Sequence, residues 1–213
     1  GASTGVLHVG FNHRFHPAIR RALELVAGGA VGRVLNVRAR YGHGGRPGLE
    51  HEWRSDPECA GGGELLDQGV HLADLIHLLC GMPESVFAEV QTAAWPIAPL
   101  EDNAYAIMRF PGGAIAQLHV SMTQWKNLFS FEVHGDAGAV IVDGLGGSYG
   151  VERLVRVERA YGGAPAMHEH RFDGEDHSWA DEWDAFVARI GEAPAANAPA
   201  GNAAQGLAAM RII

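Results

Sequence analysis

The residues best able to do chemistry lie in the segment GGGELLDQGVHLADLIH, residues 61–77. Asp67, His71 and Asp74 are spaced four and three apart, so a continuous α-helix places them within a stripe roughly 60° wide. A carboxylate one turn before an imidazole can fix the tautomer of the ring and raise its basicity. The spacing therefore indicates a general acid or base together with its orienting group.

An amphipathic helix that shows its polar side to solvent would have the same spacing. Apolar residues, however, cover more of this segment than the usual core-facing stripe, which predicts a largely buried helix whose polar groups need partners. The glycine triplet 61–63 also lets another backbone or a ligand approach the start of the helix. Both features favour the functional interpretation.

A metal site is the main alternative within enzymes. Asp67, His71 and Asp74 could supply three ligands to a divalent ion, with a nearby histidine as the fourth. Such a site would activate water in a metal-dependent hydrolase or isomerase. The chain has no H-E-x-x-H signature, so we expect no metal here.

Four residues outside this helix are candidates for binding a substrate: Arg14, His43, Trp53 and Arg54. Arg14 follows a predicted strand, where a guanidinium could reach a hydroxyl or a phosphate, and His43 lies in a glycine-rich loop that could close over a ligand. Trp53 and Arg54 combine an aromatic ring with a fork of donors, which suits a sugar face or a nicotinamide carboxamide. A surface arginine, a packing tryptophan and an ordinary turn-rich loop are the alternatives.

The elements that must position these residues follow from the apolar periodicity. Residues 6–11 and 33–42 are expected to be strands, and a helix begins at Pro17 and ends at Gly28. Six strand-like segments fill residues 85–160, and their short connections favour an antiparallel meander. Helices before and after a run of strands predict an α+β domain, with a largely antiparallel open-faced sheet and helices on one face.

A last complete helix is predicted over residues 178–190. Ser178 with Asp181 three residues later resembles a capping box. Helical spacing then marks an apolar face that we expect to be buried, formed by Trp183, Phe186, Val187 and Ile190. The segment rich in Pro and Ala that follows it is expected to be a linker before a shortened helix.

The length of 213 residues and the composition fit a single domain, or slightly more than one domain. The formal net charge is −9. The negative charge argues against a nucleic-acid partner. No apolar run approaches 18 residues, so no membrane span is expected. Cys59 and Cys80 are too few for a disulfide framework and are expected to be reduced thiols in a cytoplasmic protein.

The glycine triplet followed by Asp67 and His71 resembles a signature of the glucose-fructose oxidoreductase, inositol dehydrogenase and MocA family of NAD(P)-dependent oxidoreductases. The similarity extends to Trp53-Arg54, to the opening VGFNHRFHPAI, to SFEVHGDAGAVIVDG at 130–144 and to the helix at 178–190. The resemblance implies that His71 accepts the proton of a secondary hydroxyl on a sugar, sugar nucleotide or cyclitol. It also implies that Asp67 positions His71, while hydride passes to NAD or NADP.

Members of this family begin with a nucleotide-binding domain that carries a glycine-rich loop and a Glu-Lys-Pro triplet. Neither occurs here: G-x-G-x-x-G is absent, and the only lysine is Lys126. The chain therefore resembles the second domain alone. We expect residues 1–15 to be the end of the first domain and the strand leading out of it, 16–192 the substrate-binding and oligomerisation domain, and 193–213 a linker and a shortened helix.

The resemblance also implies a homo-oligomer formed through the open face of the sheet. Phe129, Phe131 and Val133 are candidates for that contact, and ordinary core packing is the alternative for them. The cofactor is expected to be bound mainly by the missing domain, with Trp53 and Arg54 contributing from this chain. A non-catalytic assembly domain remains the third functional class, and we expect the isolated chain to be inactive.

Overall fold

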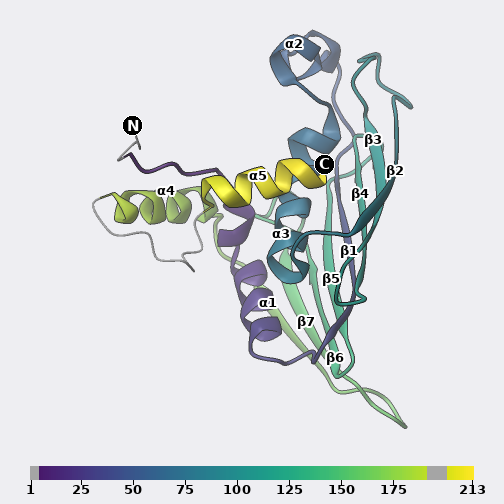
Figure 1. Cartoon of the computed structure of the whole chain (residues 1–213), viewed down its shortest axis with the longest axis vertical. Helices are drawn as coiled ribbons and strands as arrows, with labels where there is room; N and C mark the ends of the chain where they lie inside the picture. The colour runs from purple at the N-terminus through teal and green to yellow at the C-terminus, as the bar shows by residue number, and fades with distance from the viewer. Residues whose placement is uncertain (1–4, 191–200) are drawn as a thin grey trace.

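A computed structural model describes residues 5–190 and 201–213 of the chain. Its centre is one eight-stranded sheet, and the helices lie on one face of that sheet (Figure 1). The opposite face carries no helix in the described part of the chain. This arrangement confirms the predicted α+β fold with an open-faced sheet. Every helix within those residues is too short or too polar to cross a lipid bilayer.

The strands are β1 Val34–Gly42, β2 Ser85–Gln91, β3 Asn103–Arg109, β4 Ile115–Ser121, β5 Leu128–Gly135, β6 Gly138–Asp143, β7 Glu152–Glu158 and β8 Met167–Phe172. The longer helices are α1 Pro17–Ala27, α3 Val70–Cys80, α4 Ser178–Arg189 and α5 Ala203–Ile212. Short turns complete the fold: η1 Asn12–Phe15, η2 Leu49–His51, η3 Trp53–Ser55, α2 Pro57–Ala60 and the π-turn η4 Leu65–Gly69.

The strand order is β2-β3-β4-β1-β5-β6-β7-β8. All neighbours are antiparallel except β1 and β4, which run parallel. The predicted meander is therefore wrong at one point, because β1 separates the consecutive strands β4 and β5. The side chains of β1 explain its central place. Val37, Ala39 and Tyr41 are all buried under the helices, and a central position removes more of their apolar surface from water than an edge position would.

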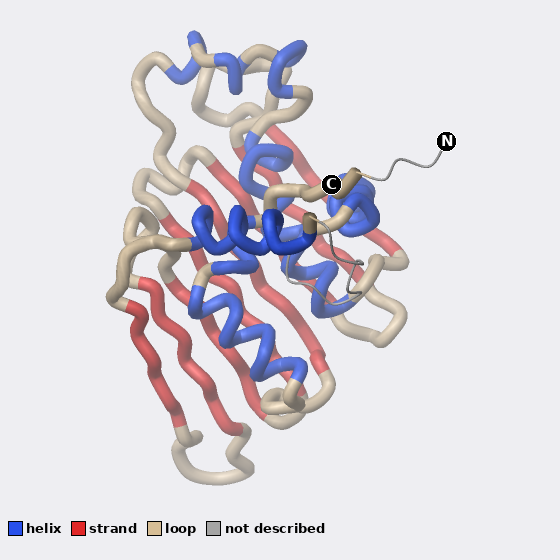
Figure 2. Tube along the Cα trace, turned by 90° about the vertical axis from the view of Figure 1, so that its left-hand side faces the viewer, coloured by secondary structure: helices blue, strands red, loops and turns tan. Residues whose placement is uncertain are grey.

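The core lies between the sheet and the helices α1, α3 and α5, which cross its middle (Figures 1 and 2). Phe129, Phe131 and Val133 point into this core and are at most 3% exposed. The prediction that they form an oligomer contact is therefore wrong, because the alternation of β5 turns them towards the helices. The open face instead exposes other large apolar side chains: Phe87, Tyr105, Ile107 and Ile115.

The predicted strand at residues 6–11 is not formed. Val9 makes a single bridge to Gly201, through a hydrogen bond of 3.1 Å from the N–H of Val9. A strand needs a continuous partner for its backbone groups, and no described segment runs alongside this one.

Helix α4 has the predicted length but differs from the prediction at its start and on its buried face. Its N-cap is His177, and the Ser178 hydroxyl accepts a hydrogen bond from Asn12 Nδ2, so the expected capping box is absent. Trp183 and Ile190 are exposed by 63% and 59%, whereas Glu182 is buried and bonded to His8. Val187 is exposed as well, and of the four predicted residues Phe186 is partly buried, with its ring 5.4 Å from that of His8. The prediction of a buried apolar face is therefore wrong for Trp183, Val187 and Ile190.

The long loop between β1 and η4 contains only the short turns η2, η3 and α2. Most of the predicted linker, residues 193–200, lies outside the described residues. The helix that follows it, α5, is capped by Asn202 and Gln205, whose side chains and backbone N–H groups bond reciprocally. Helix α5 packs across α3 and so covers the helix that carries His71.

Candidate active site

The chemistry-bearing segment begins with a π-turn rather than an α-turn. The turn η4, Leu65–Gly69, contains Asp67 and joins directly to α3. Each π-turn takes in one more residue than an α-turn, so it rotates Asp67 out of line with the residues of α3. The predicted single stripe of Asp67, His71 and Asp74 is therefore broken, and each of the three side chains has a different environment.

Of the glycines before this turn, Gly63 allows a close approach of backbone. A Cβ on Gly63 would lie 2.1 Å from the carbonyl oxygen of Glu101. The Glu101 carboxylate accepts hydrogen bonds from the N–H groups of Gly63 and Leu65 at 3.0 to 3.2 Å. An acidic side chain at the start of a helix satisfies donors that the helix leaves open. Glu101 therefore fixes the start of η4.

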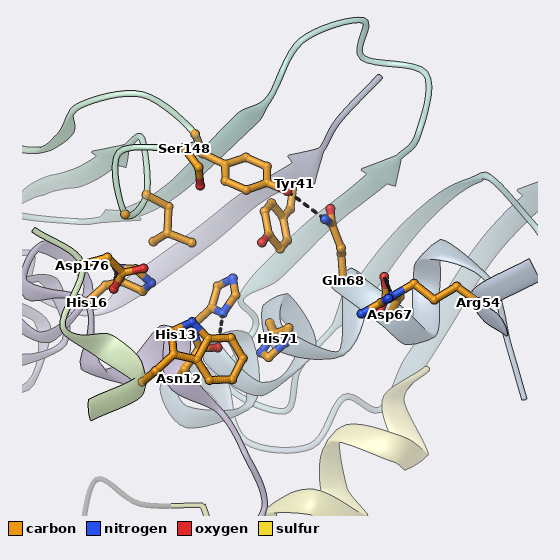
Figure 3. Close-up of a pocket in the computed structure, with 14 residues that line it drawn as sticks. Asn12, His13, His16, Tyr41, Arg54, Asp67, Gln68, His71, Ser148 and Asp176 are labelled. Atoms are coloured by element: carbon orange, nitrogen blue, oxygen red, sulfur yellow. Dashed lines mark hydrogen bonds and ion pairs between the residues drawn. The ribbon is translucent and has the colours of Figure 1, made fainter. Parts of the chain in front are cut away.

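A cavity of about 310 Å³ lies beside η4 and the start of α3 (Figure 3). Side chains from both ends of the described chain meet there, because η1, β1 and α4 all border the same space. The lining residues are Asn12, His13, His16, Tyr41, Arg54, Asp67, Gln68, His71, Leu145, Gly146, Ser148, Tyr149, Asp176 and Trp179. The cavity thus contains three of the predicted site residues: Arg54, Asp67 and His71.

His71 forms part of the cavity wall and is partly exposed, while its Nδ1 is buried without a hydrogen-bond partner in the described structure. Burial lowers the pKa of His71 to about 4, against the opposing attraction of the Asp67 carboxylate, and the charge of His16 lowers it further. The ring is therefore a neutral imidazole at pH 7 and can accept a proton. No hydrogen bond joins His71 to Asp67 within the described residues.

Asp67 instead contacts Arg54, whose Nε lies 3.4 Å from its Oδ2. The guanidinium of Arg54 also lies over the ring of Trp53, 4.5 Å from the ring centroid. Both partners of the ion pair are partly exposed at the cavity, so their charges are available to a ligand. Trp53 is 58% exposed and borders a smaller adjoining cavity of about 220 Å³, which Arg54 and Asp67 also line.

A second group of polar residues faces the cavity from the side of α1. His16 Nδ1 lies 3.2 Å from Glu152 Oε2 and 3.9 Å from Asp176 Oδ1. The glycine-rich loop before β7 permits this approach: Gly146 has φ +53°, and a Cβ there would lie 2.6 Å from Asp176. This loop forms one wall of the cavity.

Two tyrosines form the wall that lies on the sheet. The rings of Tyr41 and Tyr149 are 4.9 Å apart, and Gln68 Nε2 donates a hydrogen bond of 3.0 Å to the Tyr149 hydroxyl. Burial raises the pKa of Tyr41 and that of Tyr149, so both hydroxyls stay protonated at neutral pH. This wall offers aromatic surface together with neutral hydroxyl and amide groups.

Arg14 and Asp74 form a buried ion pair outside the cavity. Nε and Nη2 of Arg14 lie 2.7 and 2.5 Å from the two oxygens of Asp74, and both residues are at most 3% exposed. Arg14 is therefore bonded to the protein core rather than placed to meet a substrate. Because both oxygens of Asp74 are bonded to Arg14, Asp74 is not placed to be a metal ligand. No group of three possible metal ligands comes together in the described part of the chain.

His43 also lies outside the lining of the cavity. Its Nδ1 accepts a hydrogen bond from the N–H of Gly45 at 2.9 Å, and its Nε2 lies 3.9 Å from the buried carboxyl of Glu64. Burial lowers the pKa of His43 more than the nearby Asp67 raises it. Arg46, in the same loop, is exposed and bonded to Glu52.

Several lining residues were not identified from the sequence: His13, His16, Tyr41, Gln68, Tyr149, Asp176 and Trp179. The sequence contains a signal for two of them. His13 and His16 form a polar segment just before the helix that starts at Pro17. No local pattern distinguishes Asp176 or Trp179.

Comparisons with known proteins agree with this fold. Levoglucosan dehydrogenase from Pseudarthrobacter phenanthrenivorans is 27% identical over 161 residues, which are 62% of this chain and 41% of that protein. Inositol 2-dehydrogenase from Rhizobium meliloti is 30% identical over 206 residues, or 90% of this chain and 58% of that protein. A solved structure of levoglucosan dehydrogenase in complex with NADH and levoglucosan superposes with a TM-score of 0.79 at 22% identity, covering 97% of this chain and 62% of that one.

The chain thus spans about half the length of these relatives. Residues 19–141 match the profile described as the GFO/IDH/MocA C-terminal domain. That match covers more than half of the chain and includes β1, η4, α3 and the strands β2 to β5. The chain belongs to the GFO/IDH/MocA family.

Proposed function

We propose that this chain is the substrate-binding part of an NAD(P)-dependent oxidoreductase that acts on a secondary hydroxyl of a sugar or cyclitol. The observation that carries the proposal is His71: a neutral imidazole in the wall of a polar cavity, with a carboxylate close enough to raise its basicity. A neutral histidine in such a place can take the hydroxyl proton as the hydride leaves. The names of the relatives, which are sugar and cyclitol dehydrogenases, support the same reaction.

In this mechanism His71 accepts the proton through Nε2, because its Nδ1 is buried. Asp67 stabilises the imidazolium that forms, through its charge, and the Arg54 guanidinium holds the Asp67 carboxylate at the cavity. Tyr41, Gln68 and Tyr149 supply the wall against which a polyol ring packs and bonds.

The nicotinamide cofactor would accept the hydride. The sequence has no glycine-rich phosphate loop, so we propose that the nucleotide is bound mainly by a domain outside this chain. Trp53 and Arg54 fit a contribution from this side, because the stacked indole and guanidinium stand exposed where the two cavities meet. NAD and NADP fit these two residues equally well.

The charges of the cavity favour an uncharged substrate. Among the described residues, Arg54 is the only arginine in its lining and is already paired with Asp67, while Asp176 adds a second carboxylate. A phosphate or nucleotide group would have to share the Arg54 guanidinium with the Asp67 carboxylate. A monosaccharide or cyclitol would find hydroxyl, amide, imidazole and carboxylate partners, so we place phosphorylated and nucleotide-linked sugars second.

We also propose that the open face of the sheet joins copies of the protein. The exposed side chains of Phe87, Tyr105, Ile107 and Ile115 form an apolar area on β2, β3 and β4 that water would otherwise cover.

The two cysteines are unpaired, which supports a reducing location such as the cytoplasm.

The His71→Asn variant tests the catalytic assignment in the full-length enzyme. Loss of the proton acceptor should lower kcat by about 10²- to 10⁴-fold. His77→Asn is the matched control, because His77 lies on the same helix but not in the cavity. Turnover should be unchanged in the control, and circular dichroism should show both variants folded. An unchanged kcat in His71→Asn would refute His71 as the base.

A further inference from the structure

Two imidazole rings are stacked inside the cavity wall. The ring centroids of His13 and His71 lie 4.1 Å apart, with an angle of 19° between the planes. His13 comes from η1, fifty-eight positions earlier in the chain, and is only 4% exposed. One face of the His71 ring is therefore covered by His13, and the edge of Phe11 closes another side at 6.2 Å.

A chain of hydrogen bonds fixes the orientation of His13. Asn12 Nδ2 donates to the Ser178 hydroxyl at 3.2 Å. This leaves Asn12 Oδ1 as the partner of His13 Nδ1 at 3.1 Å, the bond drawn in Figure 3. The amide oxygen can only accept, so Nδ1 of His13 carries the proton and its Nε2 does not. That Nε2 is buried without a partner in the described structure. Helix α4, which supplies Ser178, therefore fixes the tautomer and the orientation of the His13 ring through Asn12.

We propose that His13 is a positioning residue for His71: its ring, held by Asn12 and Ser178, covers one face of the His71 imidazole, excludes water from it and keeps it unprotonated. The inference rests on the proposed function, in which His71 acts as a base. It adds a residue, and a tether from α4, that the signature motif of the family does not contain.

The charges around the pair are consistent with this role. Asp67 from η4 favours protonation of His71, whereas His16, which precedes α1, opposes it. Glu152 from β7 and Asp176 both face His16 rather than His71. The ring of His16 also lies against His13, 5.8 Å between centroids, and the other rings in contact with it are those of Tyr41 and Phe129, which carry no charge. The covering ring is thus the part of this environment that a single substitution can remove without changing a charge at neutral pH.

Burial also lowers the pKa of His13 itself, and the charge of a protonated His71 lowers it further. Two stacked imidazoles cannot both hold a proton at low cost, since two like charges so close repel each other strongly. His13 consequently stays neutral over the whole range in which His71 titrates.

Nuclear magnetic resonance titration of the histidine side chains in this chain tests the proposal without requiring activity. In the unmodified protein, His71 should remain unprotonated down to pH 5. His13→Ala should open one face of the ring to water and raise the midpoint of His71 by at least about one pH unit, a tenfold change in proton affinity. His13→Phe, which keeps a flat covering ring, should leave the midpoint unchanged.

His13→Asn is measured alongside, because it removes the ring but retains a polar group for Asn12 and is closer to the native contact than alanine. Its midpoint should rise as in His13→Ala. The proposal is overturned if the midpoint of His71 stays low in a folded variant without the ring, or if His13→Phe raises it as much as His13→Ala does. Either result would leave the role of His71 as base intact, since that role is tested separately by the turnover of His71→Asn.

Discussion

Replacing Glu64 by glutamine should stabilise the protein, and increasingly so as the pH rises. Glu64 is fully buried, and neither of its carboxyl oxygens has a hydrogen-bond partner in the described structure. Burial and the neighbouring carboxylates of Asp67, Glu101 and Asp102 raise the pKa of Glu64 to about 9. Its nearest possible cation is His43, 3.9 Å away, whose own pKa burial lowers. The side chain is therefore a buried neutral acid.

The size of the effect follows from the proton that only the folded state keeps. Above pH 4.5, the ordinary pKa of this group, the unfolded chain releases the proton while the folded chain holds it until about pH 9. Stability therefore falls as the pH rises between these values. Each pH unit in this range lowers the free energy of unfolding by about 1.4 kcal/mol. Glu64 therefore lowers it by about 3 kcal/mol at pH 7 and by about 1 kcal/mol at pH 5. Glutamine has the same shape and no proton to hold, so it avoids this loss.

Urea unfolding at pH 5, 7 and 8.5 measures the difference in the free energy of unfolding. The gain of Glu64→Gln over the unmodified chain should grow across this series. Glu89→Gln, the same change at an exposed position on β2, should show no such trend. A loss of stability at pH 7 would refute the reasoning, because it would mean that Glu64 is ionised and paired with a protonated His43. Parallel curves for Glu64→Gln and the unmodified chain would refute the raised pKa.

Two further predictions concern other parts of the domain. Arg14→Met should lower the free energy of unfolding by about 3 to 5 kcal/mol, because it leaves the Asp74 charge buried alone, and the double change Arg14→Met with Asp74→Leu should recover most of that loss in urea unfolding. Phe87→Glu should dissociate the proposed oligomer in sedimentation velocity without changing the unfolding midpoint of the subunit, since Phe87 is 67% exposed. A stable Arg14→Met variant, or an unchanged sedimentation coefficient for Phe87→Glu, would contradict the respective assignment.

Most of the elements could be predicted from the sequence because their signals are local. Alternation of apolar residues marks β1, and Pro17 and Gly28 mark the ends of α1. The position of β1 between β4 and β5 could not be predicted, because strand order depends on which faces are buried together in the whole sheet. The orientation of α4 failed for a related reason: periodicity shows that Trp183 and Ile190 share a face, but not that Glu182 on the other face is the one that meets the domain.

The residues of the site also differ in whether their signal in the sequence is local. Asp67 and His71 could be predicted as a pair because they lie four residues apart in the sequence, and both line the cavity. His13 was not identified, because its place before α1 does not show that it contacts His71, a residue fifty-eight positions away. Arg14 was assigned to a substrate for the same reason: its partner Asp74 is equally distant, and sequence alone shows a guanidinium without showing what neutralises it.

The π-turn η4 explains why Asp67 and Asp74 do not share one site. An uninterrupted α-helix would align Asp67, His71 and Asp74, and one polar face would then serve a single site. The additional residue in η4 turns Asp67 towards the cavity, where it meets Arg54, while Asp74 remains on the buried side and meets Arg14. His71 lies between them, with one edge at the cavity and one face against His13. Asp74 is thus a charge buried within the fold, whereas Asp67 is a charge exposed at the cavity.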